Sequence, residues 1–174
     1  MSNIKKMVIT ALLVALGIVL PPMLHAVPNA GNVLLPMHLP ILLCGIICGF
    51  PYGLACGALT PLLSHVSTGL PPSAILPSMV CELAVYGLVA GLLVQWIRMK
   101  NTYAKIYLSL IGAMLTGRIV FGVLNALVFS AGAYTLPVWL TAAFVTALPG
   151  IAIQLVLIPV IVIALGKARL ISIP

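Results

Sequence analysis

The stretch LLPMHLPILLCGIICGFPYG (residues 34–53) places a histidine between two prolines and then continues as a long apolar run. The whole chain of 174 residues shares this character, because 63% of its residues are hydrophobic and 5% are charged. Such a composition excludes an ordinary soluble domain. A helix needs about 20 apolar residues to cross the hydrocarbon core of a bilayer, which leaves room for about six crossings and no separate soluble domain. The sequence therefore predicts an all-α integral membrane protein.

Six transmembrane helices are expected where prolines, glycines and charge clusters divide the apolar sequence. The expected spans are residues 5–22, 37–50, 52–66, 74–97, 104–129 and 138–166. The first span has the basic start and apolar run of a signal peptide, but we expect it to be retained as a helix. The residues FPYG (50–53) are expected to turn the chain between the second and third spans. Together, residues 1–174 are predicted to form a single six-helix transmembrane domain.

The basic residues predict the orientation of these spans. All but one flank a span end, and with six spans they fall on one side of the membrane: Lys5, Lys6, Arg98, Lys100, Lys105, Lys167 and Arg169. By the positive-inside rule both termini are then cytoplasmic, while residues 23–36, 67–73 and 130–137 face outward. This topology and the anionic lipid of the inner leaflet account for the net charge of +7, so no nucleic-acid partner is needed.

Two charged residues are expected inside the membrane. Glu82 is the only acidic residue of the chain, and Arg118 is the one basic residue away from a span end. Both are predicted at similar depth on adjacent antiparallel spans, where an unpaired charge costs several kcal/mol. We therefore expect them to lie within ion-pair reach. They form either a purely structural pair or part of a substrate pocket that opens outward, and the two interpretations are compatible.

The histidines gather on the predicted outer side. His25, His38 and His65 all map to the outer third, together with Met37 and Asn32. Each histidine is either an interfacial residue with a local partner or part of a binding site. The occurrence of all three on one side gives the two interpretations equal weight. Pro40 is tolerated in a first helical turn, so the second span is expected to begin near His38 with its amides toward the outer pocket. We expect His38 to point into a cavity and not toward lipid.

The cysteines are interpreted as packing residues. All four lie inside apolar segments, where neither a disulfide framework nor a zinc knuckle is expected. Cys44 and Cys48 stand one helical turn apart and offer an alternative as ligands of a soft metal, but small residues at this spacing usually form helix contacts.

The first span, TALLVALGIVL (residues 10–20), has a small-residue face formed by Ala11 and Ala15. This face occurs together with six short spans, two termini predicted to be cytoplasmic and the stretch at residues 34–53. With these features the chain resembles the substrate-binding S-component of energy-coupling factor (ECF) vitamin transporters. The resemblance extends over essentially the whole chain. Further stretches similar to S-components are LPMH, GLPP and CELAVYGLVAGLL, at residues 35–38, 69–72 and 81–93.

The resemblance implies a bundle like that of S-components in the bacterial plasma membrane, with a substrate site under the outer loops. It also implies docking on a transmembrane coupling subunit and two cytoplasmic ATPases, with Ala11 and Ala15 contacting the coupling subunit. The chain would hold no cofactor of its own, and the partner subunits would use ATP. The candidate substrate-binding residues are His38, Met37, His25, His65, Asn32, Glu82, Arg118 and Tyr86.

The sequence also excludes some functions and leaves others open. It contains no Walker A motif, zinc-protease motif or serine-hydrolase motif, so we expect no enzyme activity. The substrate is expected to be a B-vitamin type compound, or haem or a corrinoid held by His38 and Met37 as axial ligands. The alternative functions are a self-sufficient, oligomeric, proton-coupled transporter or channel using Glu82, and a purely structural subunit. A nearby Arg118 opposes the proton-coupled alternative, because it would hold Glu82 ionised.

Overall fold

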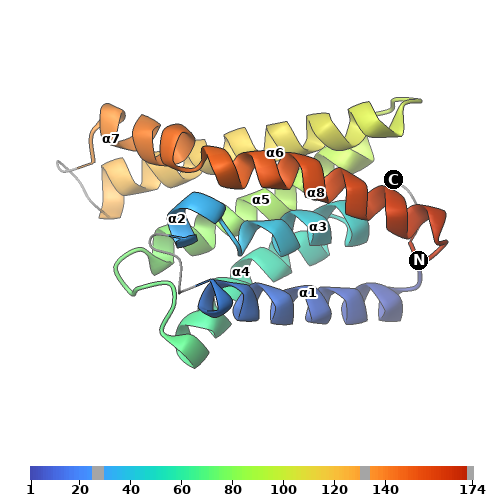
Figure 1. Cartoon of the computed structure of the whole chain (residues 1–174), viewed down its shortest axis with the longest axis horizontal. Coiled ribbons are helices and arrows are strands. Elements are labelled where there is room, and N and C mark those ends of the chain that lie inside the picture. Colours follow the sequence, from blue (N-terminus) through green and yellow to red (C-terminus); the bar gives the residue numbers. More distant parts are fainter. Residues whose placement is uncertain (25–29, 130–133, 172–174) are drawn as a thin grey trace.

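The computed structural model describes residues 1–24, 30–129 and 134–171, and these form a bundle of long helices (Figure 1). In chain order the long helices are α1 (Asn3–Met23), α3 (His38–Cys48), α4 (Phe50–Thr68), α5 (Leu76–Trp96), α6 (Thr102–Leu124) and α8 (Leu148–Lys167). Two short helices are α2 (Ala30–Leu34) and α7 (Leu136–Leu140), and two π-helical turns are η1 (Asn125–Phe129) and η2 (Thr141–Thr146). The described residues therefore confirm the predicted all-α class.

Successive long helices run in opposite directions, so the bundle has two distinct ends (Figure 1). Both described termini lie at one end, together with the α3–α4 turn and the α5–α6 link. We call this the basic end, because the seven basic residues that flank the predicted spans lie near the helix termini there. The opposite end carries α2, α7 and the α4–α5 connection, and we call it the α2/α7 end. The described residues of the three segments predicted to face outward, 23–24, 30–36, 67–73 and 134–137, thus lie at the α2/α7 end.

Five helical stretches among the described residues are long and apolar enough to cross a membrane: Asn3–Met23, Gly31–Cys48, Leu76–Trp96, Thr102–Phe129 and Leu148–Lys167. The predicted third span, α4, is not among them. Its 19 residues match the length of a crossing, but its second half is interrupted by polar side chains, including Thr60, Ser64 and His65.

Two predicted connections differ from the structure. The expected turn FPYG instead forms the start of α4, and the chain reverses at Gly49 with φ of 95°. A left-handed φ suits glycine, and Pro51 fits the first helical turn because no amide is needed there. The predicted last span at 138–166 is also wrong as one helix, because Ala147 separates η2 from α8. Pro149 in the first turn of α8 explains this break.

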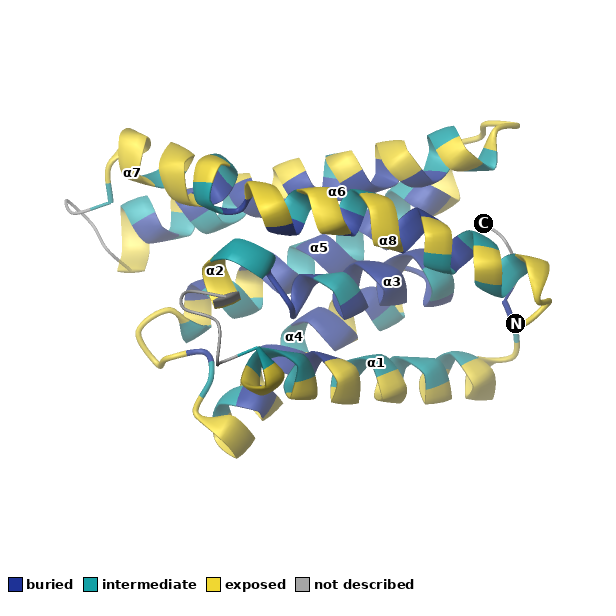
Figure 2. Ribbon diagram, viewed as in Figure 1, coloured by how far each residue is buried: buried dark blue, intermediate teal, exposed yellow. Residues whose placement is uncertain are grey.

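Helices α3, α4 and α5 meet along a line of glycines that we call the glycine seam: Gly45, Gly53, Gly57, Gly87 and Gly91. A methyl group at Gly87 would collide with the carbonyl of Gly53, and one at Gly57 would collide with the carbonyl of Leu83. Small residues at four-residue spacing allow helix backbones to approach this closely. The seam therefore fixes three helices around the buried core, which Figure 2 shows as the dark ribbon of α3 and α5.

The cysteines near the basic end pack α3 against its neighbours. The thiol of Cys44 donates to the carbonyl of Tyr52 at 3.5 Å and lies 3.5 Å from the hydroxyl of Thr10. Cys48 donates to the carbonyl of Lys6 at 3.7 Å. The described residues contain no group of three or more His, Cys, Asp or Glu side chains able to hold a metal ion. These contacts support the packing interpretation for Cys44 and Cys48, and Cys56 is buried as well. Cys81 is exposed, so the interpretation is wrong for this residue.

Helix α1 lies on the outside of the bundle and exposes most of its surface (Figure 2). Only Gly17 of this helix is buried, where its lack of a side chain leaves room for Thr60 and Pro40. Ala11 and Ala15 are exposed on the opposite side. The small-residue face predicted from the sequence is thus open to a partner or to lipid.

Candidate functional site

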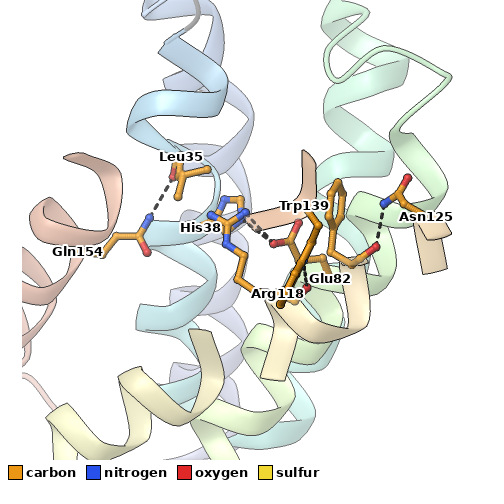
Figure 3. A network of polar contacts seen from close by, with 8 residues as sticks. Leu35, His38, Glu82, Arg118, Asn125, Trp139 and Gln154 are labelled. Carbon is orange, nitrogen blue, oxygen red and sulfur yellow. Dashed lines mark hydrogen bonds and ion pairs between the residues drawn. The ribbon is translucent and has the colours of Figure 1, made fainter. Parts of the chain in front are cut away.

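Four polar or aromatic side chains converge inside the bundle toward its α2/α7 end, and Figure 3 shows three of them, His38, Glu82 and Arg118. His38 comes from α3, Glu82 and Tyr86 from α5, and Arg118 from α6. We call these four residues the polar cluster. Glu82 and Tyr86 are one helical turn apart and so share a face of α5. Their exposed fractions are 2% for His38, 2% for Glu82, 1% for Tyr86 and 7% for Arg118, so the cluster is removed from both lipid and water.

The predicted ion pair is present. Arg118 Nη1 lies 3.2 Å from Glu82 Oε1, well within ion-pair reach. The two charges compensate each other in a region where an isolated charge would cost several kcal/mol. The reasoning from two lone charges at equal depth is therefore confirmed.

His38 adds a third ionisable group to this pair. Its Nε2 lies 3.6 Å from Glu82 Oε1, and its ring meets the ring of Tyr86 edge-on, with 5.0 Å between centroids and 88° between planes. His38 is the first residue of α3, and Pro40 stands in the same first turn, as predicted. The burial of His38 confirms that it does not face lipid.

Several polar atoms of the polar cluster have no hydrogen-bond partner among the described residues. They are both ring nitrogens of His38, Oε1 of Glu82, and Nε and Nη2 of Arg118. A buried polar atom without a partner costs about 1–3 kcal/mol, and more when it is charged. The polar cluster is thus supplied with donors and acceptors that the described protein residues do not use.

Other side chains hold the helices that carry the polar cluster. The indole of Trp139 in α7 donates to the carbonyl of Arg118 at 3.0 Å and fills the space left by Gly122. The buried amide of Gln154 in α8 donates to the carbonyl of Leu35 at 3.4 Å, just before α3. Neither contact was predicted from the sequence. The only sequence signal for the contact of Trp139 was Gly122 in α6.

The other predicted site residues that the structure describes, Met37, His65 and Asn32, do not belong to the polar cluster. Met37 belongs to the buried hydrophobic core. The Nδ1 atom of His65 lies 2.7 Å from the carbonyl of Pro71 in the α4–α5 connection, and Asn32 is exposed on α2. His25 lies outside the described residues.

A shallow apolar pocket of about 250 Å³ lies beside the polar cluster, between α6 and α7. Its lining includes Val123, Tyr134 and Trp139. Tyr134 also meets Phe121 edge-on at 6.4 Å, and its partial burial raises the pKa of its phenol, which keeps the hydroxyl neutral. This surface offers apolar contacts next to the charged residues.

Similarity to known proteins identifies the family of this chain. The chain matches the family described as "ECF transporter, substrate-specific component" over residues 5–162. Neither a curated protein nor a solved structure gave a significant match. Such a component partners with an ECF transporter module and is not an enzyme. The match extends over most of the chain and agrees with its apolar helical bundle, so this protein belongs to the family of substrate-specific components of ECF transporters.

Proposed function

We propose that this chain captures a vitamin or cofactor-like micronutrient at the outer face of the bacterial plasma membrane. It then delivers this substrate inward together with a coupling subunit and two ATPases. The observation that carries the proposal is the polar cluster, in which several buried donors and acceptors have no hydrogen-bond partner among the described residues. A buried site with a few convergent polar groups is typical of a small-molecule binding site.

The orientation follows from the distribution of charge. The basic end carries both described termini and the flanking lysines and arginines, which by the positive-inside rule supports a cytoplasmic placement of this end. The polar cluster then lies in the outer half of the membrane. We propose α4 as the sixth crossing, because it packs along α5 through the glycine seam and its polar residues Thr60 and Ser64 are buried in the bundle.

The docking surface is proposed to be the exposed face of α1 around Ala11 and Ala15. Both side chains are exposed, and they lie one helical turn apart. Two alanines at this spacing allow a helix of the coupling subunit to approach closely. The proposed transport is driven by ATP hydrolysis in the partner subunits. Proton coupling through Glu82 is disfavoured, because Arg118 compensates its charge at 3.2 Å.

The substrate is proposed to contact His38, Glu82, Tyr86 and Arg118, with the α2/α7 end closing over them. Met37, His65 and Asn32 belong to the same end and are proposed as peripheral contacts. His25, which lies outside the described residues, is proposed as a further contact from its place in the sequence. A haem or corrinoid would use His38 as an axial ligand, with Met37 as the second candidate, whereas a metal-free vitamin would accept a hydrogen bond from the His38 ring.

The function is tested by purifying the wild-type chain in mild detergent and analysing any retained small molecule by mass spectrometry and visible absorption. A haem or corrinoid gives a strong visible spectrum, and a metal-free vitamin does not. The retained molecule is then titrated against wild-type protein and His38→Ala, with Tyr103→Ala, at an exposed position of the basic end, as the control. We expect about tenfold weaker binding for His38→Ala, which is the value of one buried hydrogen bond. Wild-type protein that retains no small molecule would contradict the proposed function.

A further inference from the structure

We propose that the substrate presents a carboxylate to Arg118, which binds it through two parallel hydrogen bonds. This inference rests on the proposed function and names the chemical class of the substrate. The supporting observation concerns the guanidinium group of Arg118 (Figure 3). One of its nitrogens faces Glu82, and the other two have no hydrogen-bond partner among the described residues.

The used nitrogen is Nη1, which faces Glu82 at 3.2 Å. The unpartnered nitrogens are Nε and Nη2. These two atoms form the side edge of the guanidinium group, where the two N–H bonds are parallel and match the two oxygens of a carboxylate. The ion pair with Glu82 therefore leaves a complete two-pronged donor site free on a side chain that is 7% exposed.

The position of this edge is fixed by contacts on both sides of Arg118. Trp139 holds the backbone carbonyl of Arg118 at 3.0 Å, and the Tyr86 ring packs against the adjacent Gly117. Glu82 holds the end of the side chain. A guanidinium group that is positioned in advance loses less conformational entropy when it binds an anion.

The charge balance favours a carboxylate over a phosphate ester. Arg118 already compensates Glu82, and among the described residues His38 is the one further ionisable nitrogen group in direct contact with this pair. A carboxylate brings one negative charge, which a cationic group of the substrate can compensate. A phosphate monoester brings about 1.5–2 negative charges at neutral pH, which exceeds what the polar cluster can compensate.

The Oε1 atom of Glu82, which forms ion pairs but no hydrogen bond with the described residues, adds a second requirement. This oxygen accepts no hydrogen bond from the described residues, although it is the atom that both His38 and Arg118 approach. A substrate with an N–H or O–H group near its carboxylate would satisfy this acceptor while the carboxylate satisfies Arg118. The site therefore fits a small carboxylic acid that also carries a hydrogen-bond donor.

The test uses the molecule that wild-type protein retains. One portion is converted to its methyl ester, and mass spectrometry shows whether the molecule carries a carboxyl group. The acid and the ester are then titrated against stripped wild-type protein, Arg118→Lys and the control Arg98→Lys, which changes an arginine at the basic end. Lysine keeps the positive charge but cannot form two parallel hydrogen bonds.

We expect the ester to bind wild-type protein at least about tenfold more weakly than the acid, because one charge-assisted hydrogen bond is lost. Arg118→Lys should weaken binding of the acid by a similar factor and leave binding of the ester unchanged, while Arg98→Lys should behave as wild type. A retained molecule without a carboxyl group, or an ester that binds as tightly as the acid, would overturn the inference and leave the proposed function standing. The ester comparison needs only wild-type protein, so it decides even if Arg118→Lys fails to fold. Wild-type protein that retains nothing contradicts the proposed function itself.

Discussion

The glycine seam and the polar cluster both include residues of α5, but they are built in opposite ways. Along the seam, backbone meets backbone so closely that no methyl group fits at Gly53, Gly57 or Gly87. In the polar cluster, one turn away, donors and acceptors remain without partners. Close packing stabilises a single arrangement of helices, whereas unpartnered polar atoms cost free energy until a ligand arrives. The comparison indicates that the seam provides the stability that the polar cluster gives up.

The largest loss of stability is expected from a substitution that forces the helices of the glycine seam apart. Gly87→Val places a branched side chain against the carbonyl of Gly53, which belongs to rigid backbone. We expect a loss of about 3 kcal/mol or more in the free energy of unfolding, at the upper end of the cost of overpacking. Unfolding by denaturing detergent measures this loss. Gly31→Ala is the control, because an added methyl at Gly31 meets nothing within 4 Å. Equal stability of the two variants would refute a rigid seam.

A second variant pair tests the charges of the polar cluster. Glu82→Gln and Arg118→Gln should each lower the stability by about 3 kcal/mol, because each leaves an uncompensated buried charge. The double variant should cost less than the sum of the single variants, since neither charge then remains. A double-mutant cycle in detergent measures this coupling. Strictly additive losses would show that the two charges do not depend on each other.

The contact between α7 and α6 should have a smaller effect. Trp139→Phe removes the hydrogen bond to the carbonyl of Arg118 but keeps most of the apolar ring. We expect a loss of about 1 kcal/mol in stability, the usual value of one hydrogen bond. The matched control is Trp96→Phe, because Trp96 is 73% exposed. If both variants melted alike, Trp139 would not support the polar cluster.

The surface of α1 should contribute least to stability and most to transport. Ala11→Leu adds a bulky side chain to an exposed position, so we expect the unfolding free energy to stay within about 0.5 kcal/mol of wild type. Uptake by cells that contain the transporter module should be lost, because the partner helix is held away. Ala152→Leu, at an exposed alanine of α8, is the control for uptake. Normal uptake by Ala11→Leu would contradict the docking assignment.

The sequence was sufficient to predict features that follow from the cost of burying charge. A lone Glu82 and a lone Arg118 in apolar surroundings have few solutions other than each other. The apolar composition and the periodic breaks likewise predicted the helical class and most helix positions to within a few residues. These inferences need only local composition and the properties of a bilayer.

Features that depend on how helices pack could not be predicted in the same way. Whether His65 joins His38 depends on the rotation of α4, and a short-range contact with Pro71 occupies it instead. The role of Trp139 depends on the space that Gly122 leaves in another helix. The break at Ala147 lies inside an apolar run, where hydropathy gives no signal and only Pro149 indicates a new start.

The chain contains two tryptophans, and their placement at opposite ends gives the protein two separate fluorophores. The emission of Trp96 depends on the surrounding lipid or detergent, because its side chain is largely exposed. The indole of Trp139 instead donates a hydrogen bond to the backbone carbonyl of Arg118. In Trp96→Phe the remaining emission comes from the indole beside the polar cluster. A shift of its emission wavelength on addition of substrate would report occupancy of the polar cluster without any attached label. Substrate binding can therefore be followed by intrinsic tryptophan fluorescence.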